Sequence, residues 1–149
     1  MLLMDTPDRF VEKTRVLVVD DERHIARFLE FVLKKAGYDV ALAYSGEQAL
    51  VAVEAFDPDV MLLDLVLPKL TGLEVLKRLR ADVKYAKLVV MVLSARSFGE
   101  VPAELREAGA NEHCPKPIAP STLLNKLTAL GVPPAVSPTD PAPIPGRGT

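Results

Sequence analysis

The chain has 149 residues, of which 49% are hydrophobic and 26% charged, and its formal net charge at pH 7 is −2. This length fits one domain with one sizeable core, and the lack of a basic excess argues against a nucleic-acid partner. The single cysteine, Cys114, excludes an internal disulfide framework and is typical of a reducing compartment. Apolar runs such as 88–93 are far shorter than the roughly 18 residues of a membrane span. Asp5 follows the first apolar residues too soon for a secretory signal, so we expect a soluble cytoplasmic protein that binds no membrane.

Both ends of the chain lack the pattern of a packed core. Residues 1–13 show little hydrophobic periodicity and are expected to form a flexible extension. Six of the thirteen prolines fall within residues 131–149, where large apolar residues are scarce. Because each proline removes a backbone donor and little apolar surface is available for burial, we expect a disordered, proline-rich tail there. The folded domain would then span residues 14–130.

Short apolar runs rich in β-branched residues predict the strands. Three of the runs are continuous, which suits strands buried on both faces of a parallel sheet, because neither face then tolerates polar side chains. The predicted strands are Val16–Val19, Tyr38–Ala43, Val60–Leu63, Leu88–Leu93 and Glu112–Cys114.

The first three predicted helices have clear start and stop signals. One apolar stripe runs from Ile25 to Leu33 at spacings of three and four, and Gly37 ends that helix. Ser45–Gln48 and Thr71–Glu74 are capping boxes, in which the hydroxyl and the amide or acid satisfy two backbone donors. The helices that these boxes begin are expected to end near Phe56 and Ala81.

The last two helices complete an alternating pattern. Gly99 and Pro102 oppose a helix start near Ser97, so a short helix from Ala103 to Ala108 is expected. Five strands alternating with five helices predict an α/β fold, a doubly wound five-stranded parallel sheet with helices on both faces. The inner face of the final helix is predicted to consist of Leu123, Leu124, Leu127 and Leu130.

Polar side chains follow the predicted strands at one edge of this sheet, where ligands bind in such folds. Each has an ordinary alternative reading: Asp21 could cap a helix, Ser94 could bond to a loop, and Lys116 could be a solvated charge. Together they indicate more, because apposed carboxylates repel one another unless a cation neutralises them. Oxygen ligands favour a hard ion such as Mg²⁺, and a nearby ammonium and hydroxyl suit phosphoryl oxygens. The residues are Asp20, Asp21 and Glu22 after the first strand, Asp64 after the third, Ser94 after the fourth and Lys116 after the fifth.

Four motifs resemble those of receiver domains in bacterial two-component response regulators. They occur in the family's order and spacing, and the resemblance covers about residues 14–130. Any one motif is a weak signal, whereas four in register are specific. The resemblance implies a flavodoxin-like strand order of 2-1-3-4-5, with strands numbered along the chain. The motifs are Val18–Glu22, Leu63–Pro68, Leu93–Arg96, and Gly109–Glu112 leading to Lys116-Pro117.

The resemblance also implies the roles of the acidic residues. Asp64 would take a phosphoryl group from a phosphohistidine on a sensor histidine kinase or a histidine phosphotransfer protein. Asp20 and Asp21 would bind Mg²⁺ together with Asp64, and the backbone carbonyl of Val66 would complete the protein's ligands. A carboxylate is a competent nucleophile when a metal and an ammonium neutralise the developing charge. The protein would be no enzyme beyond catalysing its own phosphorylation and dephosphorylation.

The remaining implied roles concern the response to phosphorylation. Lys116 would pair with the phosphoryl oxygens, and Ser94 would hydrogen-bond them as its loop moves inward. In this family the peptide bond corresponding to Lys116-Pro117 is typically cis. His113 stands where receivers usually carry Tyr or Phe, so switching would be weaker or pH-dependent. The alternative is that His113 is an exposed surface residue.

Two further departures from the family pattern concern phosphoryl lifetime and output. Val66 and Arg96 occupy positions that influence the access of attacking water, and apolar Val66 predicts a comparatively long-lived acyl phosphate. Gly99 and Pro102 predict a shortened or displaced helix within residues 97–108, with a benign loop variation as the alternative. That helix belongs, with the last strand and last helix, to the face that receivers use for protein effectors and homodimers.

Other functions fit the sequence less well. A scaffold that binds partners without being phosphorylated would keep the fold, but the acids and Lys116 that it could lose are all present. Aspartyl hydrolases usually carry a second Asp two residues after the nucleophile, where this chain has Glu22 after Asp20, and they need a cap domain. A flavin phosphate would be repelled by Asp21 and Glu22. A DNA-binding regulator would need more chain than follows Leu130.

Overall fold

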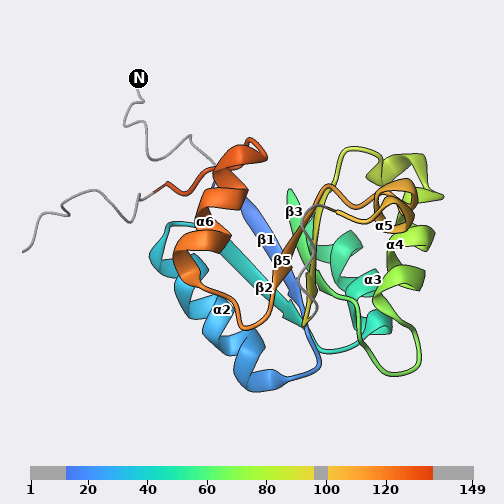
Figure 1. The fold of residues 1–149 in the computed structure, drawn as a ribbon, viewed down its shortest axis with the longest axis horizontal. Coiled ribbons are helices and arrows are strands. Elements are labelled where there is room, and N and C mark those ends of the chain that lie inside the picture. The colour runs from blue at the N-terminus through green and yellow to red at the C-terminus, as the bar shows by residue number, and fades with distance from the viewer. Residues whose placement is uncertain (1–12, 96–100, 136–149) are drawn as a thin grey trace, which may run out of the picture.

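The computed structural model describes residues 13–95 and 101–135 and contains one parallel sheet with strand order β2-β1-β3-β4-β5 (Figure 1). The predicted strand order is therefore confirmed, and each strand lies within one or two residues of its predicted bounds. The strands are β1 (Arg15–Val19), β2 (Asp39–Ala43), β3 (Val60–Asp64), β4 (Val89–Ser94) and β5 (Glu112–Pro115).

The helices cover both faces of the sheet, as the alternating pattern predicts. In Figure 1, α2 and α6 lie on one face and α3, α4 and α5 on the other. A short 3₁₀ helix, η1 (Val83–Tyr85), was not predicted, because three residues carry no hydrophobic period. The α-helices are α2 (Arg23–Lys35), α3 (Gly46–Phe56), α4 (Gly72–Arg80), α5 (Ala103–Ala108) and α6 (Pro120–Ala129).

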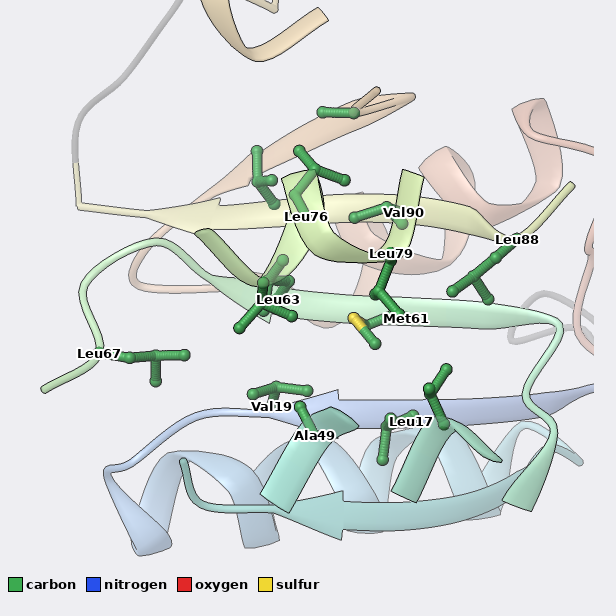
Figure 2. Close-up of a cluster of buried hydrophobic side chains, with 14 of the residues drawn as sticks. Leu17, Val19, Ala49, Met61, Leu63, Leu67, Leu76, Leu79, Leu88 and Val90 are labelled. Carbon is green, nitrogen blue, oxygen red and sulfur yellow. The ribbon is translucent and has the colours of Figure 1, made fainter. Parts of the chain in front are cut away.

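Two hydrophobic clusters, one on each face, hold the helices to the sheet. Alternate strand residues point to opposite faces, so β1 gives Leu17 to one cluster and Val18 to the other. Figure 2 shows the cluster beneath α3 and α4, where Met61 of β3 lies between Leu17 of β1 and Leu79 of α4. Because both faces are covered, the continuous apolar runs of the central strands follow directly from the architecture.

The two predicted capping boxes differ in the structure. The box at the start of α4 is complete, since Thr71 Oγ1 accepts from Glu74 N at 3.2 Å and Glu74 Oε1 accepts from Thr71 N at 2.9 Å. At α3, Ser45 Oγ accepts from Gln48 N at 3.1 Å as expected. The reciprocal half of that prediction is wrong: Gln48 Oε1 accepts from Tyr44 N at 2.8 Å, one residue earlier.

Packed structure extends beyond the predicted domain boundary at residue 130. Val132 N donates to Leu127 O at 3.0 Å, the hydroxyl of buried Tyr38 donates to Val132 O at 2.6 Å, and Val132 packs against the cluster beneath α2 and α6. Burial raises the pKa of the Tyr38 hydroxyl, which keeps it a donor. The first residues of the predicted tail are thus anchored. Residues 1–12 and 136–149 lie outside the described residues, so the extension and the rest of the tail stay predictions.

The short helix before β5 agrees with its predicted bounds. Pro102 is the N-cap of α5, which ends at Gly109 with a φ of 112°. Gly99 and Arg96 fall outside the described residues, so how the segment before Val101 is arranged stays a prediction. Within residues 13–95 and 101–135, no helix combines the length and the apolarity that crossing a membrane requires.

Candidate functional site

The strand register brings the predicted site residues to the carboxyl edge of the sheet. Asp64 is the last residue of β3 and lies opposite Leu93, and Ser94 ends β4 opposite Pro115. Asp20 follows β1, and its backbone N–H donates to Ala43 O at 3.0 Å. The ends of β1, β3, β4 and β5 therefore converge, as parallel strands require.

Three carboxylates meet at this edge. One oxygen from each of Asp20, Asp21 and Asp64 lies within 4.8 Å of the other two. Asp20 is fully buried and Asp64 is 4% exposed, whereas Asp21 is exposed. Charged carboxylates are rarely buried in such proximity without a cation.

This donor set fits Mg²⁺. The ion prefers hard oxygen ligands and is usually held by one or two carboxylates together with waters and phosphate oxygens. Two buried carboxylates and one exposed carboxylate provide that chemistry and leave a side open to solvent. Asp20 Oδ2 is fully buried, and the Lys116 ammonium lies 2.8 Å from it, so one positive charge already faces this carboxylate.

The start of α2 fixes the Asp20 side chain. Asp20 Oδ1 accepts a hydrogen bond from Glu22 N at 3.0 Å. The N-cap of α2 is Glu22, whose side chain makes no capping bond. The alternative reading of Asp21 as a helix cap is therefore wrong, and the Asp21 side chain is left exposed beside the two buried acids.

Lys116 supplies the positive charge of the site. Its Nζ lies 2.8 Å from Asp20 Oδ2, 3.2 Å from Asp64 Oδ2 and 3.8 Å from Glu22 Oε1. Its backbone N–H donates to Ser94 O at 2.7 Å, which ties it to the end of β4. The peptide bond to Pro117 is cis, as the resemblance implies. Lys116 is no solvated surface charge, since only 15% of its side chain is exposed.

Burial and charge act in opposite directions on the two central groups. Burial raises the pKa of Asp64, and the Asp20 charge adds to this, although the Val66 backbone N–H and Lys116 partly oppose it. Burial by itself would lower the pKa of Lys116, but the hydrogen bond to Asp20 and the charges of Asp64 and Asp20 raise it overall. The Lys116 ammonium therefore stays charged. The buried Asp64 carboxylate beside it is stabilised by a positive charge that neutralises it.

The loop after β3 arranges Asp64 and Val66. Val66 N donates to Asp64 Oδ1 at 3.0 Å, which leaves Oδ2 facing Lys116. Val66 is 76% exposed, so its side chain contributes little to the core. Its influence on the access of water stays a prediction.

Ser94 and His113 are both buried. His113 lies opposite Val92, so it points to the sheet face covered by α3, α4 and α5. Its Nδ1 is 3.7 Å from Glu112 Oε1. The alternative of an exposed surface histidine is therefore wrong, and His113 occupies an interior position on the strand that leads to Lys116. Arg96 lies outside the described residues.

Gly72 contributes to the site in a way that sequence reasoning missed. It begins α4, and its N–H donates to Leu65 O at 3.1 Å. A Cβ atom there would lie 2.3 Å from the Asp64 carbonyl oxygen and 2.7 Å from Leu65 Cα. The only sequence signal was a glycine inside a capping box, where many residues are tolerated.

Comparison with known proteins shows which family has this architecture. The profile of the response regulator receiver domain matches residues 16–128, most of the chain. The chain belongs to the receiver domain family. It is thus the receiver domain of a two-component response regulator, a class that signals by phosphorylation, generally uses Mg²⁺, and works with histidine kinases and downstream effectors.

Individual relatives agree with this assignment. The receiver is 42% identical over 117 residues to the response regulator MprA of Mycobacterium avium, and 36% identical over 116 residues to the alkaline phosphatase synthesis transcriptional regulatory protein PhoP of Bacillus subtilis. Each alignment covers 78% of this chain but only 50% and 48% of those proteins. The chain thus spans about half the length of these curated relatives.

Solved structures match over nearly their whole length. The chemotaxis response regulator CheY4 of Vibrio cholerae has a TM-score of 0.75 and 31% identity, covering 80% of this chain and 99% of CheY4. A putative response regulator from Chloroflexus aurantiacus has a TM-score of 0.73 and 35% identity, covering 80% and 98%. The CheY-like, flavodoxin-type fold expected from the sequence is confirmed.

Proposed function

We propose that Asp64 accepts a phosphoryl group from a phosphohistidine on a sensor histidine kinase or a histidine phosphotransfer protein. The observation that carries this proposal is the placement of the Asp64 carboxylate. It is buried, its Oδ2 lies 3.2 Å from the Lys116 ammonium, and two further carboxylates lie close enough to share a cation with it. A carboxylate with those neighbours suits attack on phosphorus better than a structural role.

The transfer balances without any additional reactant. An Asp64 carboxylate oxygen forms the new O–P bond while the P–N bond to the donor imidazole breaks. The imidazole leaves with that electron pair and takes up a proton, and the product on this chain is an acyl phosphate. Hydrolysis then returns the free carboxylate and inorganic phosphate, so the protein acts chemically on itself alone.

The acidic cluster would hold Mg²⁺ through Asp20, Asp21 and Asp64, with the Val66 backbone carbonyl as a further ligand. Bound there, the ion would neutralise charge on the phosphoryl oxygens and help to orient them. Asp20 is already fixed by its bond to Glu22 N, and Asp64 by its bond to Val66 N, so both carboxylates are oriented in advance. Exposed Asp21 can adjust at low cost.

Lys116, Ser94 and His113 would respond to the new phosphoryl group. The Lys116 ammonium, held charged between Asp20 and Asp64, would pair with phosphoryl oxygens in place of the carboxylate oxygen that it contacts now. Ser94 ends the adjacent strand, and its hydroxyl would donate to the phosphoryl group. Movement of that strand end would reach His113, because β4 and β5 are paired from Met91 to Ser94.

Val66 would set how long the acyl phosphate lasts. Its exposed apolar side chain lies two residues after Asp64, where it can hinder an incoming water without offering it a hydrogen bond. Replacing Val66 with Asn should accelerate dephosphorylation several-fold, as measured by the loss of phosphorylated mass from purified protein over time. An unchanged rate would contradict this role.

The output would be a phosphorylation-dependent contact with a cytoplasmic protein. The face formed by α5, β5 and α6 adjoins both Ser94 and His113, so it would change most on phosphorylation. That face would bind the effector or a second copy of the chain. No nucleic-acid or membrane partner is proposed.

The proposal is tested by incubating the protein with Mg²⁺ and acetyl phosphate and measuring its intact mass. We expect a mass increase of one phosphoryl group that depends on Mg²⁺ and is absent from Asp64→Asn. Beryllofluoride should bind the wild type and not the variant. A wild type that takes up neither group would contradict the proposal and favour the scaffold that binds partners without phosphorylation.

A further inference from the structure

We infer that Gly72 is a positioning residue for the phosphoacceptor: the absence of its side chain lets the start of α4 hold the backbone of Asp64 and Leu65 in place. This inference rests on the proposed function of Asp64. It concerns a residue that contacts no substrate and that lies eight positions along the chain from Asp64.

The backbone of Leu65, the residue after Asp64, is held from two sides. On one side, Leu65 N donates to Leu93 O of β4 at 3.1 Å. On the other, Gly72 N donates to Leu65 O at 3.1 Å, from the first residue of α4. The backbone of Leu65 is therefore clamped between the sheet and the helix, directly between Asp64 and Val66.

This clamp has no room for a methyl group. A Cβ on Gly72 would lie 2.3 Å from the Asp64 carbonyl oxygen and 3.0 Å from the Asp64 carbonyl carbon. Both are backbone atoms, so no side-chain rotation can relieve the contact. To reach 3.0 Å, the oxygen and the methyl group would have to separate by at least about 0.7 Å. Displacements of this size at a reacting group reduce rates strongly, by roughly a hundredfold for about 1 Å.

A second glycine provides a matched control. Gly46 is also buried, begins α3, and follows a hydroxyl N-cap. A Cβ there would lie 2.7 Å from Leu70 O and 2.9 Å from a methyl carbon of Val75. Gly46→Ala thus also crowds a backbone oxygen and the core, although its shortest contact is about 0.4 Å longer than at Gly72, and it does not press on the Asp64–Leu65 peptide. A purely structural role for Gly72 predicts that the two variants behave alike.

The experiment compares the two alanine variants with the wild type at a temperature where circular dichroism shows all three folded. Mg²⁺ affinity is measured by calorimetry, and the maximal rate of phosphorylation is measured with acetyl phosphate. We expect both variants to lose thermal stability, but only Gly72→Ala to lose about tenfold in Mg²⁺ affinity and tenfold or more in maximal rate, with little change in the donor concentration for half-maximal rate.

A milder pair of variants decides the matter if Gly72→Ala does not fold. Thr71→Ala removes the hydroxyl that accepts from Glu74 N and loosens the first turn of α4, while Ser45→Ala does the same at α3. We expect a two- to threefold loss of Mg²⁺ affinity and rate for Thr71→Ala and none for Ser45→Ala.

The outcomes separate this inference from the proposed function. Equal Mg²⁺ affinity and rate in the two members of either pair would overturn the positioning role while leaving the phosphoacceptor role of Asp64 intact. A wild type that neither binds Mg²⁺ nor becomes phosphorylated would contradict the proposed function, and this inference would fall with it.

Discussion

The two edges of the sheet treat their polar groups differently. At the amino edge, Arg80 donates to Gly109 O, Tyr85 O and the side chain of Asn111, and Asn111 Oδ1 also accepts from Val90 N. At the carboxyl edge, buried Asp20 and Asp64 lie beside one ammonium, and burial raises the pKa of Asp64. At the amino edge each donor is paired with an acceptor, whereas at the carboxyl edge carboxylates of like charge lie close together.

This difference separates the part of the molecule that stabilises the fold from the part that carries the chemistry. Matched hydrogen bonds to a guanidinium stabilise each element that they join. Apposed buried carboxylates cost stability, and they persist where a cation or a phosphoryl group completes the site. Substitutions at the amino edge should therefore lower stability and leave phosphorylation intact. Removing a carboxylate at the carboxyl edge should raise stability and abolish phosphorylation.

The largest effect is expected for Lys116→Met. Removing the ammonium leaves buried Asp20 and Asp64 uncompensated, which should lower the free energy of unfolding by about 3 kcal/mol. Chemical denaturation in the absence of metal measures this loss, and added Mg²⁺ should recover part of it by neutralising the same carboxylates. Lys126→Met is the control, because Lys126 lies 3.7 Å from a half-buried Glu112 and should matter less. Equal losses of unfolding free energy in Lys116→Met and Lys126→Met would contradict the role of Lys116 in compensating the buried carboxylates.

Arg80→Ala should come next, with a loss of about 2 kcal/mol. The substitution leaves Gly109 O and Tyr85 O without their guanidinium donor at the amino edge. Arg78→Ala, at an exposed position on the same helix, should stay within about 0.5 kcal/mol. Folded Arg80→Ala should still accept a phosphoryl group at the wild-type rate. If Arg80→Ala lost phosphorylation rate but no stability, the proposed separation of a stabilising amino edge from a chemical carboxyl edge would be contradicted.

Asp64→Asn should change the free energy of unfolding in the opposite direction and by a smaller amount. Removing one of the apposed charges should raise the free energy of unfolding by about 1 kcal/mol at neutral pH without metal, while abolishing phosphorylation. Asp59→Asn at the amino edge should stay within about 0.5 kcal/mol, because an amide oxygen can still accept from Arg15 N.

The pH dependence of this gain follows from the raised pKa of Asp64. The folded chain binds a proton at Asp64 at higher pH than the unfolded chain, where the ordinary value is 3.8. As the pH falls toward the folded pKa, the wild type is therefore stabilised relative to the variant, and the gain should shrink. Paired denaturation curves between pH 7 and pH 4 measure it, and a constant gain would show that charge is not its cause.

The carboxyl edge was predictable from the sequence because its residues are chemically conspicuous. Asp20, Asp64 and Ser94 each follow a continuous apolar run that suits a buried strand, and Lys116 follows the short last strand. Parallel strands end at a common edge. Carboxylates that gather at this edge repel one another, so they indicate a site for a cation or a phosphoryl group. The fold and the candidate site therefore followed from the same pattern.

The amino edge and the fine structure of the loops were not predictable in this way. Arg80 is one base among several in α4, and nothing in the sequence marks it as the one that reaches Gly109 and Asn111. Gly72 is needed because of a close approach to a peptide eight residues away, which depends on tertiary packing. The anchoring of Val132 by Tyr38 depends on a contact between residues far apart in the chain.

The central claim, that the carboxyl edge exists to phosphorylate Asp64, is tested most directly by locating the phosphoryl group. Borohydride reduces an acyl phosphate of aspartate to homoserine, so reduction after phosphorylation with Mg²⁺ and acetyl phosphate, followed by peptide mass mapping, marks the modified residue. We predict homoserine at position 64 and an unmodified Asp20 and Asp21. Homoserine at position 20 or 21, or none in phosphodonor-treated wild type, would contradict the account.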